Sequence, residues 1–126
     1  EISLGLVGSE MCIRDSYSDQ EAFHLLGYDE KNILKAYLRA FSPNIKYKGV
    51  SMGRIVVEED MRNKSIGKEI TNIGIRFLSE KYPNHEIIIS AQHRLQKFYE
   101  GLGFIARGEV YLEDDIDHIQ MYMLSK

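Results

Sequence analysis

The chain has 126 residues, of which 44% are hydrophobic and 10% aromatic, enough for one compact core and too few for two ordinary domains. Lys and Arg together number 16 against 19 Asp and Glu, so the chain lacks the basic excess on which sequence-independent nucleic-acid binding depends, and we expect no nucleic-acid partner. The longest apolar runs, such as residues 87–89, fall far short of the roughly 20 residues that cross a bilayer, which predicts no membrane partner.

Residues 1–16 differ from the rest of the chain. They have neither helical nor strand periodicity and resemble a translated sequencing-adapter read-through, so the sequence predicts an artefactual segment that contributes no packed element. A genuine N-terminal arm is the alternative. No basic region precedes an apolar run, so we expect no signal peptide. The single cysteine, Cys12, cannot form an internal disulfide and no Cys/His spacing fits zinc, which together predict a reducing cytoplasm and no metal site.

From Tyr17 onward the pattern predicts three strands. Apolar and aromatic runs at residues 22–28 and 33–41 are separated by a polar turn, which indicates an antiparallel hairpin. Pro43 interrupts the pattern after this hairpin. Residues 50–57, rich in β-branched side chains, then predict a third strand.

Helices and strands alternate in the second half. Apolar residues three to four positions apart over residues 66–78 predict an amphipathic helix that ends before Pro83. Residues 86–90 predict a short buried strand, and a second apolar stripe over residues 95–102 predicts a helix with Gly103 as its C-cap. Two further strand patterns complete the order, at residues 106–112 and 118–124. The sequence therefore predicts one α+β domain over residues 17–126, a mixed sheet with helices packed on it.

The connection between the third strand and the first helix is the main candidate binding site. Backbone N–H groups at a helix N-terminus lack intrahelical acceptors and carry a partial positive charge, which suits a pyrophosphate, and Gly67 allows close approach. An ordinary strand-to-helix connection with solvated charges is the alternative. A nucleotide-binding P-loop does not fit, because Arg62 replaces the required glycine and Glu69 replaces the Ser or Thr that holds magnesium.

Residues 54–68 resemble the acetyl-coenzyme A signature of GNAT acetyltransferases, Gln/Arg-x-x-Gly-x-Gly/Ala, with Arg62 and Gly67 in matching positions. Two longer stretches, AQHRLQKFYEGLGF at 91–104 and GEVYLEDDIDHIQM at 108–121, resemble the ElaA-like branch of that superfamily. The resemblance covers about Tyr17 to the C-terminus and implies a GNAT-like mixed, mostly antiparallel sheet flanked by helices.

The chain departs from the family pattern in three places. Ser65 replaces a signature glycine, and Asp115 and Asp117 replace the usual glycine and proline. The first strand and helices of the family have no counterpart in residues 1–16, and these elements normally help to wall the acceptor site.

The resemblance implies direct transfer of an acetyl group from acetyl-coenzyme A to a primary amine of a small molecule or peptide. A non-catalytic coenzyme-A-binding or interaction domain is the alternative, and a homodimer stays open. By resemblance, the backbone of Ile55, Val56 and Val57 would run beside the pantetheine arm. The implied pyrophosphate site consists of Arg62, Asn63, Lys64, Ser65, Ile66, Gly67 and Lys68.

Tyr99 matches the family tyrosine that points toward the coenzyme sulfur, so the resemblance implies a catalytic acid. Its helical spacing alone is more typical of a core aromatic residue. Glu113, Asp114 and His118 are candidates for the base, and a solvated turn, a structural histidine and a water chain are the alternatives. His24 is predicted to lie half-buried on the sheet, and a place beside the acceptor is the alternative. His85 and His93 are predicted to lie at the surface.

Overall fold

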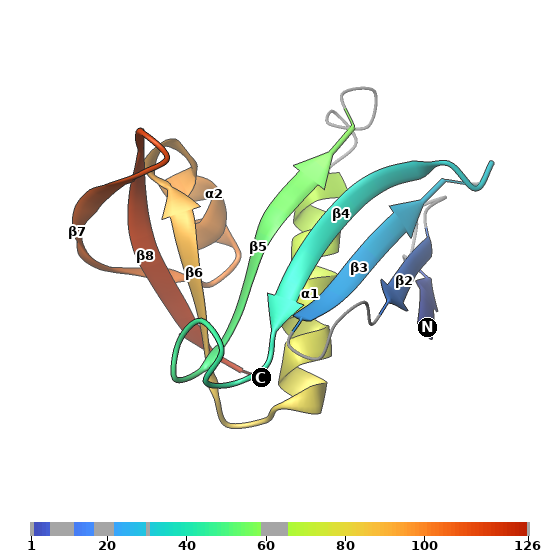
Figure 1. The fold of residues 1–126 in the computed structure, drawn as a ribbon, viewed down its shortest axis with the longest axis horizontal. Coiled ribbons are helices and arrows are strands. Elements are labelled where there is room, and N and C mark those ends of the chain that lie inside the picture. Colours follow the sequence, from blue (N-terminus) through green and yellow to red (C-terminus); the bar gives the residue numbers. More distant parts are fainter. Residues whose placement is uncertain (1, 6–11, 17–21, 30, 59–65, 126) are drawn as a thin grey trace.

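A computed structural model describes residues 2–5, 12–16, 22–29, 31–58 and 66–125. Its elements form one twisted sheet with two helices behind it in the view of Figure 1. In chain order they are β1 (Ile2–Gly5), β2 (Cys12–Ser16), β3 (Ala22–Tyr28), β4 (Leu34–Phe41), β5 (Val50–Val57), α1 (Ile66–Lys81), β6 (Glu86–Gln92), a 3₁₀ turn (His93–Leu95), α2 (Gln96–Gly101), β7 (Ile105–Glu113) and β8 (Ile116–Leu124).

The strands of the sheet follow the order β1-β2-β3-β4-β5-β6-β8-β7. Every neighbouring pair is antiparallel except β5 and β6, which run parallel because α1 connects them as a crossover. The mixed, mostly antiparallel sheet predicted from the sequence is therefore confirmed. The predicted sequence of elements from the first hairpin to the last strand is confirmed as well.

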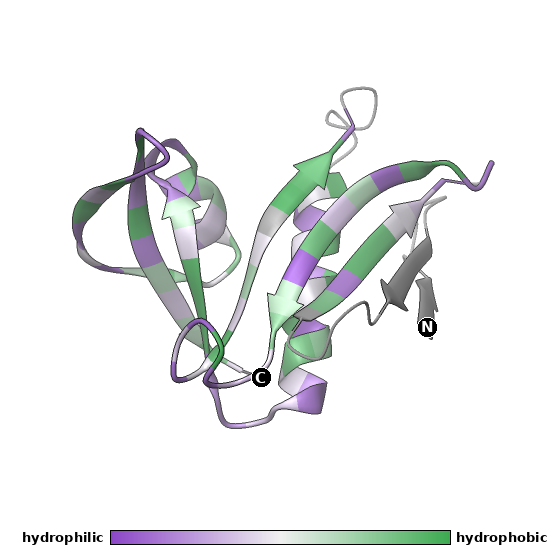
Figure 2. Ribbon diagram, in the orientation of Figure 1, coloured by the Kyte–Doolittle hydropathy of each residue, from purple (hydrophilic) through white to green (hydrophobic). Residues whose placement is uncertain are grey.

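Alternation of side chains determines which face of each strand is buried. In β4 the residues Ala36, Leu38 and Ala40 are buried while those between them are half-buried. Figure 2 shows hydrophobic and hydrophilic residues alternating along this strand. The hairpin from β3 to β4 is closed by Asp29, whose carboxylate accepts hydrogen bonds from the backbone N–H groups of Lys31 and Ile33 at 2.9 and 3.0 Å.

Both helices pack on the same face of the sheet. Gly74 of α1 lies so close to β4 and β5 that an added Cβ would be 3.1 Å from Leu38 Cδ1 and from Met52 Sδ. α2 contributes Tyr99 to the same core cluster, which also contains Ile89 of β6. We call the opposite side of the sheet, away from α1 and α2, the outer face. No helix in the described residues is long and apolar enough to cross a membrane.

The expectation that residues 1–16 contribute no structural element is corrected by the structure. β1 pairs with β2, and β2 pairs with β3 from Cys12 opposite Tyr28 to Ser16 opposite His24, so the sheet continues into this segment. Backbone pairing of this kind requires no periodic apolar pattern, which is why the sequence did not reveal it. The hypothesis that residues 1–16 are artefactual, and that the domain lacks its first strand and helices, stays a prediction.

Candidate functional site

β5 and β6 are neighbours in the sheet but separate soon after they begin. They pair at only two positions, Val50 with Ile87 and Ser51 with Ile88. Figure 1 shows the two strands diverging toward their C-terminal ends. Over residues 53–56 the edge of β5 that faces β6 has no strand partner in the described part of the chain, although its other edge stays paired with β4. Backbone amides at such an edge can bind a ligand that carries amides of its own.

A bulge in β5 lies just beyond the last residues that pair with β6. β4 pairs Arg39 with Gly53 and Tyr37 with Val56, so two residue steps on β4 match three on β5. The extra residue in β5 bends the strand and increases its local twist. β6 stays paired with β8 from Glu86 to Gln92.

The predicted pantetheine-binding residues lie on the diverging part of β5. Val56 is 56% exposed, whereas Ile55 and Val57 are half-buried against the core. Val57 also lies near the start of α1, because an added Cβ on Gly67 would be 3.8 Å from its Cγ2 atom. The end of β5 and the first turn of α1 therefore adjoin one another.

The predicted pyrophosphate site is described only in part. Ile66 is buried, Gly67 is half-buried and Lys68 is exposed, all in the first turn of α1. Glu69 follows them, and its Oε2 atom is buried without a hydrogen-bond partner among the described residues. The dipole at the helix N-terminus offsets part of that cost. The other predicted members lie outside the described residues: Arg62, Asn63, Lys64 and Ser65.

Tyr99 lies on α2 and is 8% exposed. Its ring packs edge-to-face on Phe98 and Phe104, with centroids 5.1 and 5.9 Å apart. Burial raises the pKa of the Tyr99 hydroxyl above its ordinary value. The ring is thus part of the core, as its spacing indicates, and the hydroxyl is a proton donor near neutral pH.

Four polar side chains meet on the outer face of β6, β7 and β8. The Ser90 hydroxyl donates a hydrogen bond to Glu113 Oε1 at 3.0 Å, and it also contacts the Tyr111 hydroxyl, which therefore donates to Ser90. The second carboxylate oxygen, Oε2, lies 3.6 Å from Nε2 of His118. Tyr111 stacks on His118 with ring centroids 6.2 Å apart. We call Ser90, Tyr111, Glu113 and His118 the outer-face cluster.

Hydrogen bonding determines which nitrogen of His118 can accept a proton. Nδ1 lies 2.7 Å from the carbonyl oxygen of Ile116, which can only accept, so Nδ1 carries a hydrogen. In the neutral ring, Nε2 is then unprotonated and presents its lone pair to Glu113, whose carboxylate is also an acceptor. Nε2 is therefore the atom of His118 that can accept a proton, with the Glu113 carboxylate 3.6 Å away.

Tyr47, from the loop between β4 and β5, lies close to the outer-face cluster. Burial raises the pKa of the Tyr47 hydroxyl, and the neighbouring Tyr111 and Glu113 raise it further. A side-chain hydrogen bond with Gln120 acts in the opposite direction. The loop therefore contributes an uncharged phenol to this side of the sheet at neutral pH.

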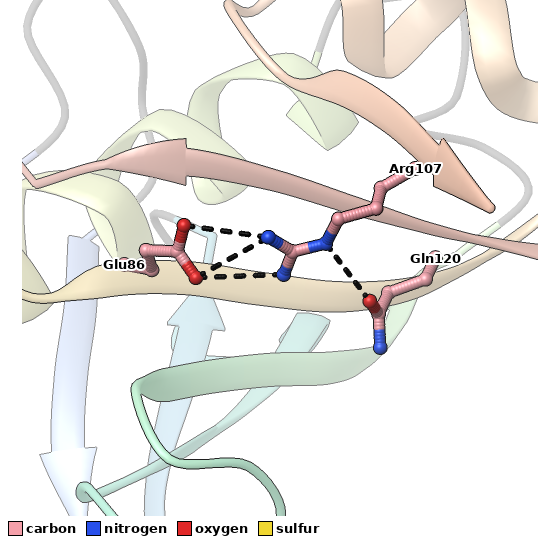
Figure 3. Close-up of polar contacts among 3 residues, drawn as sticks. All are labelled: Glu86, Arg107 and Gln120. Atoms are coloured by element: carbon pink, nitrogen blue, oxygen red, sulfur yellow. Dashed lines mark hydrogen bonds and ion pairs between the residues drawn. The ribbon is translucent and has the colours of Figure 1, made fainter.

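Arg107 of β7 is exposed and has an acidic partner within the protein. Figure 3 shows its guanidinium between Glu86 and Gln120, with Nε donating to Gln120 Oε1 at 3.1 Å and a terminal nitrogen 3.4 Å from Glu86 Oε2. The guanidinium carbon also lies 4.3 Å from the centroid of the Tyr122 ring. Glu86 therefore supplies a counter-ion for Arg107, and Gln120 accepts a hydrogen bond from it.

A second polar group lies on the outer face of β3 and β4. Nδ1 of His24 is 2.5 Å from the Tyr37 hydroxyl, and the two rings stack with centroids 5.8 Å apart. Nε of Arg39 lies 3.4 Å from the same hydroxyl. All three side chains are half-buried, so the prediction that His24 lies half-buried on the sheet is confirmed.

The other predicted residues lie apart from these groups. Asp114 occupies the turn between β7 and β8 and is exposed. His93 is exposed, as predicted. His85 is half-buried rather than at the surface, and the centroid of its ring lies 6.2 Å from that of the Tyr82 ring. In the described ranges, no three His, Cys, Asp or Glu side chains gather closely enough to hold a metal ion.

Sequence patterns missed four residues of these two groups. Ser90, Tyr111, Tyr37 and Arg39 each occupy an alternate position in a strand, which is the pattern of any strand with one face toward solvent. Only the register between strands brings them to a common place, and period-two alternation carries no information about register.

Comparisons with known proteins agree with this geometry. A family model described as an acetyltransferase (GNAT) domain matches residues 8–125. A UPF0039 protein of Synechocystis is 35% identical over 103 residues, which cover 82% of this chain and 67% of that protein. The ElaA protein of Escherichia coli is 33% identical over 98 residues, which cover 78% of this chain and 63% of ElaA.

Solved structures share the fold. An acyl-CoA N-acyltransferase from Pseudomonas aeruginosa aligns with a TM-score of 0.76 at 33% identity, covering 82% of this chain and 69% of that one. Escherichia coli ElaA aligns with a TM-score of 0.74 at 31% identity, with the same coverage. The chain spans about two thirds of the length of the curated relatives it matches. The resemblance found in the sequence is confirmed, and the chain belongs to the GNAT acetyltransferase family.

Proposed function

We propose that this protein transfers an acetyl group from acetyl-coenzyme A to a primary amine of a small molecule or peptide. The observation that carries the proposal is the early divergence of β5 from β6, between the start of α1 and the outer-face cluster. Family membership supports an acyltransferase, and one similar structure is described as an acyl-CoA N-acyltransferase. The acetyl group and the amine acceptor are part of our proposal.

The residues present fit coenzyme A. Amide groups of a pantetheine arm match the β5 backbone over residues 53–56, which has no strand partner on that side. A pyrophosphate suits the N-terminus of α1, so we assign Ile55, Val56 and Val57 to the arm and residues 62–68 to the phosphates. When bound, the thioester supplies an activated acyl carbon. A backbone N–H of β5 beside it would stabilise negative charge on the carbonyl oxygen.

The proposed base and the proposed acid lie on opposite faces of the sheet. Glu113 and His118, on the outer face, accept the proton that the amine loses as its nitrogen bonds to the carbonyl carbon. Tyr99, on the helical face, donates a proton to the sulfur as the carbon–sulfur bond breaks, because a tyrosine hydroxyl is protonated near neutral pH. Solvent then restores both groups.

A direct assay tests the proposal. The protein is incubated with acetyl-coenzyme A and a panel of amines, free thiol release is followed, and the acetylated product is identified by mass spectrometry. We expect thiol release that depends on an amine, with one acetyl group added per thiol. Binding of acetyl-coenzyme A with no thiol release across the panel would favour the non-catalytic coenzyme-binding domain instead.

A further inference from the structure

We propose that the acceptor is an amine that also carries an anionic oxygen group, a carboxylate or a phosphate, and that Arg39 binds this group. The inference rests on the proposed function and names the substrate class of the same site. It follows from the arrangement of two arginines on the outer face, Arg107, which is ion-paired, and Arg39, which has no carboxylate partner among the described residues.

Strand register aligns Arg39 with the outer-face cluster. Arg39 of β4 pairs with Gly53 of β5. Ser51 of β5 pairs with Ile88 in the parallel neighbour β6, so Gly53, two residues further on, is level with Ser90. Residues that are level in adjacent strands project from the same face. Arg39 and Ser90 therefore flank Gly53 on the outer face, one on each side of the divergence.

Strand register also connects Ser90 to the other arginine, Arg107. Ser90 pairs with Gln120 of β8, and Gln120 pairs with Arg107 of β7. Arg107 is ion-paired with Glu86 and hydrogen-bonded to Gln120, as Figure 3 shows. Its charge is balanced inside the protein, so it has little to offer a ligand.

Arg39 has surroundings that differ from those of Arg107. Its one hydrogen bond within the described part of the chain runs from Nε to the Tyr37 hydroxyl at 3.4 Å, and no carboxylate there pairs with it. A half-buried charge without a counter-ion is costly, so the site favours an anion. Because Nε is oriented by Tyr37, the two terminal nitrogens form the planar fork that binds carboxylate or phosphate in a bidentate manner.

Space for the ligand lies over Gly53. A Cβ built on Gly53 would meet no atom of the other described residues within 4 Å, its two chain neighbours apart. Adjacent strands lie about 4.8 Å apart, so the backbones of Arg39 and Ser90 are separated by roughly 10 Å or more where β5 and β6 diverge. Ser90 is hydrogen-bonded to Glu113. If the amino group of the acceptor binds at Glu113, an anionic group several bonds further along the acceptor can therefore reach Arg39. A diamine of the same length would bring its second ammonium against the guanidinium.

Matched acceptors test the proposal. The probes are 4-aminobutyrate and 3-aminopropyl phosphate as anionic amines, and butylamine and 4-aminobutanamide as neutral counterparts. We expect kcat/KM for at least one anionic amine to exceed that of the neutral pair by about 10- to 100-fold, the range of a charged hydrogen-bonded contact. The two anionic probes distinguish carboxylate from phosphate. Equal values for all four probes would overturn the inference while leaving the proposed function intact.

Variants of Arg39 identify the group responsible. Arg39→Gln should raise KM for the preferred anionic amine by about 10- to 100-fold, leave kcat nearly unchanged and leave butylamine kinetics unaffected. Arg39→Lys, which keeps the charge and loses the fork, should recover part of the loss. Arg76 is an exposed arginine of α1 on the other face of the sheet. Arg76→Gln is therefore the matched control and should leave the kinetics of both substrates unchanged. A loss in Arg39→Gln that is equal for charged and neutral amines would contradict the assignment.

Calorimetry separates this inference from the proposed function. If no amine is acetylated, the proposed function fails, and binding of 4-aminobutyrate and 3-aminopropyl phosphate to the full chain still decides the inference. Binding of either compound that Arg39→Gln abolishes, and that Arg76→Gln preserves, would support it. Binding that is absent, or unchanged in Arg39→Gln, would overturn it.

Discussion

Nε2 of His118 and Oε2 of Glu113 lie 3.6 Å apart, on opposite arms of the hairpin formed by β7 and β8. The two-residue turn between the arms has positive φ at both positions, 52° at Asp114 and 61° at Asp115, as a type I′ turn requires. Asp115 stands where the family resemblance expects glycine, and an aspartate tolerates the left-handed conformation better than most residues. The substitution is therefore compatible with a turn that brings Glu113 and His118 together.

Glu113→Gln tests whether this pair accepts the amine proton. The amide keeps the size of the side chain and can donate to Nε2, but it cannot share a proton as a carboxylate does. We expect kcat to fall by about 100- to 10,000-fold with acetyl-coenzyme A binding unchanged. Asp114→Asn, next in the chain and tolerant of the same turn conformation, is the control for a general charge effect. Equal losses in the two variants would argue against a specific base.

Tyr99→Phe tests the proposed acid. The change removes the hydroxyl and retains the ring that packs on Phe98 and Phe104, so the fold should be nearly unaffected. Since a thiolate is already a fair leaving group, we expect a fall in kcat near the lower end of the usual range, about 100-fold. The measurement is kcat at saturating acetyl-coenzyme A beside the Tm of both proteins. Wild-type turnover would leave protonation of the sulfur to solvent.

Stability at alkaline pH provides an independent check on Tyr99 and Tyr47. Their pKa values are raised in the folded state, so the unfolded chain loses these protons at lower pH than the folded chain. The contribution of these two groups to the free energy of unfolding is fully present below about pH 10, the pKa of an unfolded tyrosine. It is lost as pH rises through the raised pKa values of the folded state. Urea midpoints measured between pH 8 and 11 should therefore fall less steeply in Tyr99→Phe and Tyr47→Phe than in the wild type. Parallel curves would contradict the shifts.

Gly67→Asp tests the phosphate-binding role of the first turn of α1. A Cβ at this position makes only an ordinary contact with Val57, so the fold should accept the side chain, while its charge repels a phosphate. We expect a large loss of acetyl-coenzyme A affinity by calorimetry. Gly67→Asn has nearly the same volume without the charge and should lose much less. Unchanged affinity in both variants would exclude this turn as the phosphate site.

Gly49 and Gly53 form a matched pair for stability. An added Cβ on Gly49 would overlap the backbone carbonyl of Glu86, which cannot move aside cheaply, whereas one on Gly53 meets nothing within 4 Å. Gly49→Ala should destabilise the fold by about 1 to 3 kcal/mol or more, as overpacking does, and Gly53→Ala should be neutral or slightly stabilising. Urea denaturation of both variants measures the difference. Similar effects at the two positions would contradict the close approach at Gly49.

Local patterns in the sequence predicted most of the fold. Apolar periodicity identified α1 and the strands from β3 to β8, because each buries one face and the spacing of apolar residues follows the geometry of the element. Gly103 was predicted as the C-cap of α2; the C-cap is Leu102, and Gly103 follows it with a φ of 107°, a conformation that suits glycine just after a helix. The same reasoning did not detect β1 and β2, because backbone pairing leaves no signature in the sequence when polar and apolar residues do not alternate.

The sequence by itself determined the fold class, the family resemblance and the candidate residues Tyr99, Glu113 and His118. Only the tertiary structure decided that Glu113 is hydrogen-bonded to Ser90 and lies 3.6 Å from His118, and that no carboxylate in the described part of the chain pairs with Arg39 on the same outer face. Propensity and periodicity act within a few residues along the chain. Strand register, the bulge in β5 and the pairing of charges depend on contacts between segments that are distant in sequence, and these form only when the sheet is assembled.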